Sequence, residues 1–385
     1  MDIAHIRRQI SALDGYAYLN VAGAGPAPQV VQDEVMAWME WHNQNLGRPG
    51  LPDRTHAMLH QARSSMARLL GCTADEVALT HNATEGILLT AWGRHWEAGD
   101  EVIITDQEHP ANVVPWHNLA QRYGIRVRMV RIETETDPLL VIQPLLNDRT
   151  RMISISHISR ETGRIMPIKR IARLARAHGV RLLVDGAQSV GAIPVDVVDL
   201  GCDYYVWCGH KRLLGPAGTG GIYFHPQALE DTLPSWVGWN AQAQWNGKNH
   251  AFLRRAKRFE SGTHNYAVYA GLIRAIDWLE EVGLDAIWER NAMLDQLLVA
   301  RLQQKPALCL KRPASEASGV VGFSSGDNNH KLCLWLREQE RLVICPVGQA
   351  GIRVSVHFFN TQEEIEHLSL AIDRALDENA GVQYG

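Results

Sequence analysis

Seven short apolar runs, separated by stretches with helical periodicity, are the feature that most constrains the fold of this chain. The runs lie at residues 76–80, 101–105, 127–130, 152–156, 180–184, 204–208 and 220–224. They show little polar–apolar alternation, which is typical of strands covered on both faces. Their alternation with helices predicts an α/β fold with a mostly parallel, seven-stranded sheet and helices on both faces.

The pattern changes around residues 245–260, where a polar stretch precedes a long helix that we expect to begin near Tyr266. Two later strands, at residues 320–324 and 353–358, indicate a smaller α+β unit. Its three predicted helices lie at residues 286–304, 328–340 and 361–377. We therefore predict a large domain over residues 16–260. Residues 1–15 together with 261–385 form the predicted small domain.

Composition excludes several classes of protein. The chain has 385 residues and a formal net charge of −4 without a basic block, so we expect neither a nucleic-acid nor a membrane partner. No apolar run approaches the roughly 20 residues of a membrane span. Six cysteines occur without a Cys-x-x-Cys pair, which predicts reduced thiols and a cytoplasmic location. His56 and His60 have helical i, i+4 spacing but no third ligand, so we expect no metal site.

Residues of opposite charge follow two of the predicted strands. Asp185 ends one apolar run, and Lys211 lies three residues beyond another. Because ligands of open α/β sheets bind beyond the carboxyl ends of the strands, both side chains should face one crevice. Either residue alone fits an ordinary surface lysine or strand-end aspartate. The pair suits pyridoxal 5′-phosphate (PLP), which needs a lysine for its Schiff base and an acid for its ring nitrogen.

The segments Asp185-Gly-Ala-Gln188 and Gly209-His210-Lys211 resemble the class V aminotransferase family of PLP enzymes. That family includes cysteine desulfurases, cysteine and cystine C–S lyases, selenocysteine lyases and isopenicillin N epimerases. Further similar motifs run from Glu108 to Trp116 and from Arg258 to Asn265. The resemblance implies the fold type I architecture, in which a large domain holds the cofactor and a small domain closes over the substrate.

The resemblance also implies roles for individual residues. Lys211 would carry the Schiff base and return as a general base, and Asp185 would pair with the pyridinium nitrogen. Gln188 would donate to the phenolic oxygen of the ring. His109 would stack on the ring and is a candidate for proton transfer at the substrate.

Phosphate contacts are expected at the start of the helix after residue 80, where free N–H groups and the helix dipole favour an anion. Ala83 would contribute its backbone and Thr84 a hydroxyl, although simple helix capping explains this segment equally well. The resemblance adds His210 and Cys208, a cysteine where the family usually has Ser or Thr. It also adds Thr263, which in family dimers reaches the neighbouring subunit's phosphate. We therefore expect a homodimer with a shared active site.

Three residues are candidates for binding a small amino-acid substrate. Arg353 matches the arginine that binds the substrate carboxylate, for which a planar guanidinium is suited. Asn112 belongs to the motif around His109. Arg160 stands where desulfurases usually have Asn, and it either recognises a second carboxylate or points outward.

Cys345 decides which reaction the sequence favours. Desulfurases use a cysteine on a mobile loop well before the carboxylate-binding arginine, whereas Cys345 directly follows an apolar run and lies close to Arg353. We therefore predict a PLP-dependent lyase that eliminates the sulfur substituent from cysteine, cystine or an S-substituted cysteine, giving pyruvate, ammonia and a thiol or persulfide. A desulfurase, an epimerase or racemase, and an aminotransferase remain alternatives, as does a protein that only binds PLP.

Overall fold

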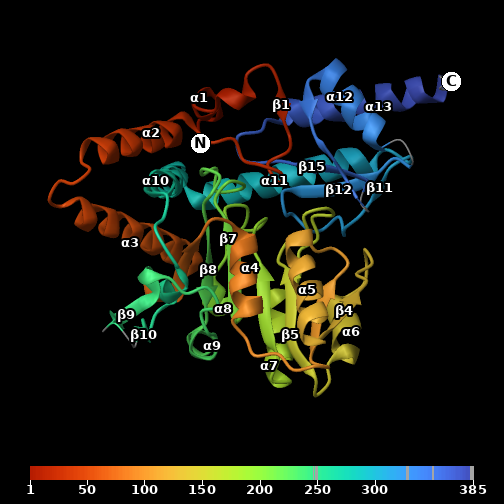
Figure 1. The fold of residues 1–385 in the computed structure, drawn as a ribbon. Coiled ribbons are helices and arrows are strands. Elements are labelled where there is room, and N and C mark those ends of the chain that lie inside the picture. The colour runs from red at the N-terminus through yellow and green to blue at the C-terminus, as the bar shows by residue number, and fades with distance from the viewer. Residues whose placement is uncertain (246, 248–249, 327–328, 349–350, 382–385) are drawn as a thin grey trace.

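The computed structural model describes residues 1–245, 247, 250–326, 329–348 and 351–381 (Figure 1). Its centre is a seven-stranded sheet. In spatial order the strands are β2 (Val77–Thr80), β8 (Gly220–Phe224), β7 (Tyr204–Cys208), β6 (Arg181–Asp185), β5 (Thr150–Ser156), β3 (Glu101–Thr105) and β4 (Arg126–Val130). Only β8 runs antiparallel to its neighbours within this sheet. The predicted fold class, a mostly parallel seven-stranded α/β sheet, is confirmed.

Helices pack on both faces of this sheet, which explains why its inner strands are largely apolar, whereas the edge strand β4 exposes Arg126 and Met129. Val102 and Ile104 of β3 belong to the cluster beneath α4 (Ala83–Trp92) and α5 (Val114–Tyr123). Ile103, between them, faces the opposite cluster with α3 (Leu51–Leu70), α7 (Ile168–Ala177) and α10 (Tyr266–Val282). Successive side chains of one strand thus enter two different cores.

A second, antiparallel sheet contains β11 (Cys309–Leu310), β12 (Val320–Ser324), β15 (Gly351–Ser355) and β14 (Cys345–Val347) in that order. It packs with α11 (Leu284–Gln303), α12 (Asn329–Glu340) and α13 (Gln362–Gly381) around a separate apolar cluster. The predicted strand 353–358 stops at Ser355, because the next carbonyl, that of Val356, accepts a hydrogen bond from Arg212 instead. Residue 328, the predicted start of α12, lies outside the described residues.

The N-terminal segment joins this second sheet region rather than the central sheet. After α1 (Ile3–Arg8), strand β1 (Ala17–Tyr18) pairs in parallel with β13 (Leu342–Val343), and Asn20 bridges to Ser355. Residues 17–20 therefore lie with the C-terminal part of the chain, beyond the limit of residue 15 that we predicted. The division into two domains stays a prediction.

The remaining elements lie at the periphery. Helix α2 (Gln29–Gln44) forms, together with α3, an arm that extends to the left in Figure 1. The other short elements are α6 (Pro138–Ile142), α8 (Val197–Leu200), α9 (Pro226–Asp231), β9 (Gln242–Trp245) and β10 (His250–Phe252). Among the described residues, no helix combines the length and apolar character needed to cross a membrane.

Candidate active site

Asp185 and Lys211 lie at the carboxyl ends of neighbouring parallel strands, as predicted. Asp185 is the last residue of β6, is 6% exposed, and accepts a hydrogen bond of 2.9 Å from the Ala187 N–H. Half-buried Lys211 follows β7, which pairs with β6. Burial raises the pKa of Asp185, and the positive charge of Lys211 opposes that rise. The structure thus brings this carboxylate and this amine into electrostatic contact.

The backbone of Lys211 is held from two sides. Gly25 of the N-terminal loop donates its N–H to the carbonyl of His210 over 2.7 Å. The guanidinium of Arg212 donates to the carbonyls of Gly319, over 2.9 Å, and of Val356. Lys211 therefore sits between the N-terminal loop and the C-terminal sheet. Sequence reasoning missed Arg212, whose only signal was its place next to the lysine.

A second group that the sequence did not reveal lies beneath Asp185. The Tyr205 hydroxyl contacts the Ser189 hydroxyl at 2.6 Å and His157 Nδ1 at 2.8 Å. A Cβ on Gly186 would lie 2.1 Å from the ring of Tyr205, so only glycine fits after the aspartate. This packing fixes the direction in which the strand-end carboxylate points.

Gln188 connects the same segment to the N-terminal loop. Its Nε2 donates to the carbonyl of Ala22 over 2.8 Å, and its Oε1 is buried without a hydrogen-bond partner among the residues that the structure describes. A buried amide oxygen without a donor is unusual and indicates a place for a ligand. The Oε1 atom of Gln188 is therefore open to a ligand donor, whereas Nε2, the predicted donor to the cofactor, is bound to the Ala22 carbonyl.

His109 is positioned by a buried network around Glu108. The carboxylate of Glu108 accepts from Thr105, Asn112 and Ser156, and burial raises its pKa to about 7. Asn112 Oδ1 accepts from Ser154 Oγ over 2.5 Å, and Nδ2 donates to Glu108 over 2.8 Å. The prediction that Asn112 binds substrate stays untested, and these contacts support a positioning role instead.

The imidazole of His109 is neutral and surrounded by cations. Nδ1 accepts the Ala111 N–H over 3.0 Å, which assigns the proton to Nε2. Burial, followed by the positive charges of Arg160, Lys211 and Arg353, lowers the pKa of His109 to about 4. A neutral ring is suited to stacking against a flat cofactor and to accepting a proton.

Arg353 and Arg160 lie side by side. Arg353 is 4% exposed; its Nη1 donates to the carbonyl of Arg160 over 3.1 Å and its Nη2 to Asn20 Oδ1 over 2.8 Å. Both acceptors are neutral, and in the described part of the chain the buried Nε of Arg353 has no hydrogen-bond partner. A buried guanidinium with neutral partners is suited to binding a carboxylate.

The predicted phosphate residues meet at the start of α4. A Cβ on Gly86 would lie 2.6 Å from Val206 Cγ1, so α4 packs closely on β7. Half-buried Thr84 lies in the first turn, where N–H groups have no acceptor within the helix. Cys208 ends β7, and its Sγ contacts the Ala187 carbonyl at 3.9 Å. Nδ1 of His210 is buried, with no hydrogen-bond partner within the described ranges.

Thr263 is the one predicted cofactor residue that lies elsewhere. It is exposed and lines a groove of about 620 Å³ together with Trp38 and His42 of α2. Its segment is anchored by Glu260, which hydrogen-bonds Arg63 and His264. Within one chain, the groove residues are different from those grouped around Lys211.

These residues fit PLP. The amine of Lys211 acts electrostatically on the buried carboxylate of Asp185 and on the neutral imidazole of His109, and buried polar atoms of Gln188, His210 and Arg353 lack partners among the described residues. Residues 17–368 match the family model described as "Aminotransferase class-V". The chain belongs to the class V aminotransferase family.

Similarity to characterised relatives supports this membership. The chain is 32% identical to "Probable cysteine desulfurase" of Mycolicibacterium paratuberculosis, over 92% of this chain and 54% of that protein. It is 32% identical to "Cysteine desulfurase" of Salmonella agona, over 97% of this chain and 96% of that protein. The chain thus spans about half the length of the first relative and nearly all of the second.

A solved structure shows the same fold and the cofactor. The structure of the cystine C–S lyase C-DES in complex with cysteine persulfide has a TM-score of 0.88 to this chain. The two sequences are 30% identical, and the match covers 94% of this chain and 98% of that one. Another structure of a C-DES mutant, with a TM-score of 0.89, has glycine covalently linked to PLP. Our chain therefore has the fold type I architecture, as predicted.

Proposed function

We propose that this chain is a PLP-dependent C–S lyase that acts on cysteine, cystine or an S-substituted cysteine. The products are pyruvate, ammonia and a thiol or persulfide. The observation that carries the proposal is the pairing of a carboxylate-binding residue, Arg353, with the Lys211–Asp185 pair, in a site whose nearby thiols lie within strands rather than on a loop. Relatives named for cysteine desulfurization and cystine C–S cleavage support this substrate class.

Two thiols lie near the proposed site, and both are held by the fold. Burial raises the pKa of Cys208 to about 11, so this residue is a neutral thiol. Cys345 lies in β14, directly opposite Arg353, and its Sγ is 3.2 Å from the Pro346 carbonyl. A persulfide carrier has to move between the substrate and an acceptor, and a residue within a strand is unsuited to that motion.

Each residue has a defined task in this reaction. PLP withdraws electrons from the substrate Cα when it is bound. Arg353 holds the α-carboxylate, and Lys211 Nζ removes the proton from Cα. Asp185 would offer its carboxylate to the ring nitrogen of bound PLP, and neutral His109 would pack against the ring. The start of α4, with Ala83 and Thr84, binds the phosphate together with His210 and Cys208.

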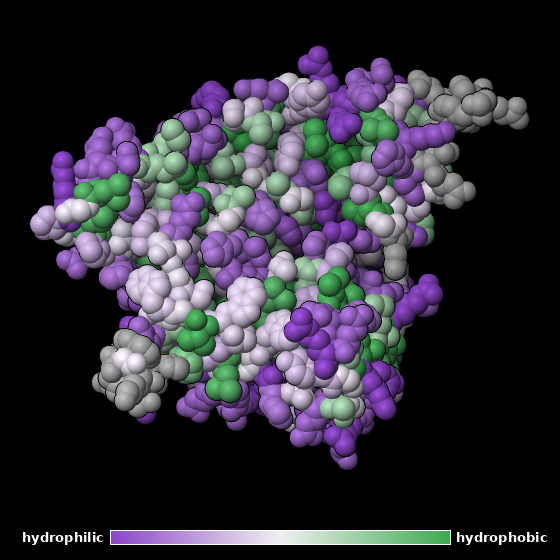
Figure 2. Space-filling model, in the orientation of Figure 1, coloured by the Kyte–Doolittle hydropathy of each residue, from purple (hydrophilic) through white to green (hydrophobic). Residues whose placement is uncertain are grey.

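A homodimer with a shared active site is part of the proposal. Exposed apolar side chains on α2, namely Met36 and Met39, lie beside the groove that contains Thr263. Figure 2 shows green, apolar side chains among purple ones on the arm formed by α2 and α3. Trp236 and Trp239 are also more than half exposed, at 55% and 60%. Such a surface supports contact with a second copy that would place Thr263 near the partner's phosphate.

The expected partner is a small amino acid, with no nucleic acid or membrane involved. A cytoplasmic location is also proposed. All six cysteines are free in the structure, including exposed Cys309, which is typical of a reducing compartment.

A desulfurase is the second candidate, because Cys345 lies next to Arg353 and several relatives carry that name. One experiment separates the candidates. The purified PLP enzyme is incubated with cysteine, cystine and S-methylcysteine, and the three-carbon product is identified. Pyruvate supports the lyase, alanine supports the desulfurase, and a D-amino acid supports a racemase.

A further inference from the structure

Arg160 is a charged residue of the site for which the proposed reaction has no task. Its side chain is 28% exposed, and Nη2 lies 3.2 Å from Glu161 Oε1. Its Nε is buried and has no hydrogen-bond partner among the described residues. A buried N–H without an acceptor costs free energy, so this edge of the guanidinium is suited to a ligand oxygen.

The position of Arg160 relative to Arg353 indicates which part of a ligand it meets. The Arg353 guanidinium touches the backbone carbonyl of Arg160, and both cations act on His109. When Arg353 binds the α-carboxylate of a substrate, the guanidinium of Arg160 is therefore the neighbouring cation that another part of this substrate can reach. The Glu161 side chain, which pairs with Arg160 at 3.2 Å, is 18% exposed, and a ligand carboxylate would compete with it for the guanidinium.

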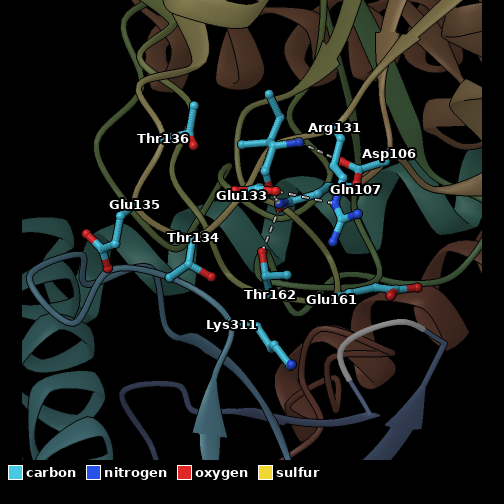
Figure 3. A pocket seen from close by; sticks show the side chains of 11 residues that line it. Asp106, Gln107, Arg131, Glu133, Thr134, Glu135, Thr136, Glu161, Thr162 and Lys311 are labelled. Atoms are coloured by element: carbon cyan, nitrogen blue, oxygen red, sulfur yellow. Dashed lines mark hydrogen bonds and ion pairs between the residues drawn. The ribbon is translucent and has the colours of Figure 1, made fainter.

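A groove of about 500 Å³ is lined by Glu161, the residue next to Arg160, and provides room for a substituent. Gln107 and Thr162 line it and are joined by a hydrogen bond of 2.8 Å, with Lys311 across from them (Figure 3). Glu133 and Glu135 also line the groove. Because these acids repel anions, an acidic substituent is held near Arg160 rather than farther along the groove.

We infer that Arg160 is a specificity-determining residue that binds a carboxylate on the sulfur substituent of the substrate. This rests on the proposed lyase function. The preferred substrates are then S-substituted cysteines with an acidic substituent, such as S-carboxymethylcysteine. In the reaction the Cβ–S bond breaks, the sulfur keeps the electron pair and gains a proton, and the Cα proton passes to Lys211. Arg160 orients the leaving thiol and takes no part in bond breaking.

The test compares two ligands of nearly equal shape, S-carboxymethylcysteine and S-carbamoylmethylcysteine, which differ in one charge. Their dissociation constants are measured from the absorbance change of the bound PLP. The unaltered enzyme should bind the acid about tenfold or more tightly than the amide. Arg160→Gln should remove this preference, and Arg160→Lys should retain part of it. Arg131→Gln, in the same groove and 81% exposed, is the matched control.

Three results would overturn the inference: no preference for the acid in the unaltered enzyme, a preference that survives Arg160→Gln, or equal weakening of both ligands in that variant. Equal weakening would assign Arg160 to the α-carboxylate that the ligands share. Retention of the PLP absorbance shows that the variant has folded. Binding is separate from turnover, so a preference without pyruvate would contradict the lyase alone, and pyruvate without a preference would contradict Arg160 alone.

Discussion

A methyl group on Gly25 would lie only 1.9 Å from the carbonyl oxygen of Lys211. The N-terminal loop is thus in direct backbone contact with the segment that carries the proposed Schiff-base lysine. The N–H of the same glycine donates to the His210 carbonyl, so a hydrogen bond fixes this close contact between the two segments.

Gly25→Ala should therefore displace Lys211 and lower C–S cleavage by about tenfold or more, because overpacking of this kind costs about 1–3 kcal/mol. PLP absorbance and pyruvate release measure the effect. Ala24→Ser, at an exposed position in the same loop, should leave both unchanged. Normal activity of Gly25→Ala would show that the loop does not position the lysine.

Lys211→Ala should abolish the absorbance band near the edge of the visible range that marks PLP bound to a lysine, since no amine remains for the linkage. The spectrum of the purified variant, with PLP added, checks this. Lys169→Ala removes an exposed lysine paired with Asp199 and should keep the band. A band that persists without Lys211 would remove that residue from its proposed role.

Cys345→Ser should change pyruvate formation less than about twofold, because a lyase needs no cysteine nucleophile. Cys309→Ser, at an exposed position on β11, is the control for a general effect of losing a thiol. A collapse of activity in Cys345→Ser alone would favour the desulfurase. The product assay should then find alanine.

Thr263→Asp should weaken PLP binding in the homodimer, because its negative charge would face the phosphate of the other subunit. Mixed dimers of Lys211→Ala and Thr263→Asp chains test whether the site is shared. If it is, one of their two sites has both intact residues, and activity exceeds that of either variant homodimer. Activity no higher than the mean of the homodimers would assign Thr263 to its own subunit.

The buried imidazole of His157 should make stability depend on pH. Burial lowers the pKa of His157 to about 4 from the ordinary 6.5. The unfolded chain therefore binds a proton between these values that the folded chain does not. Stability is full above pH about 6.5 and falls as the pH decreases toward about 4, by up to ~1.4 kcal/mol per pH unit.

Denaturant unfolding across this pH range measures the slope. His157→Gln should flatten it relative to the unaltered protein, even if the variant is less stable at neutral pH because the contact with Tyr205 changes. His178→Gln, at an exposed histidine after α7, serves as the control. An unchanged slope in His157→Gln would show that this residue does not titrate as described.

Local sequence patterns were enough to predict the strands of the central sheet and the positions of several site residues. Most strands of the central sheet contain a contiguous apolar run, because helices cover both faces, and this signal needs no knowledge of distant residues. The edge strand β4, with two arginines, is the exception. The placement of Asp185 and Lys211 followed from the same rule, since parallel strands end at one edge. The family motifs added Arg353 and His109, which the structure brings close to Lys211.

Only the tertiary structure decided the contacts between segments far apart in the chain. Strand β1 pairs with β13, Gly25 packs on Lys211, and Arg212 bonds carbonyls of the C-terminal sheet. Such contacts depend on how separate elements dock, and short polar or glycine-rich segments carry no periodic signal for their partners. The sequence also left open whether the Arg160 side chain faces the site or points outward, because the direction of a side chain on a loop is set by the packing around it.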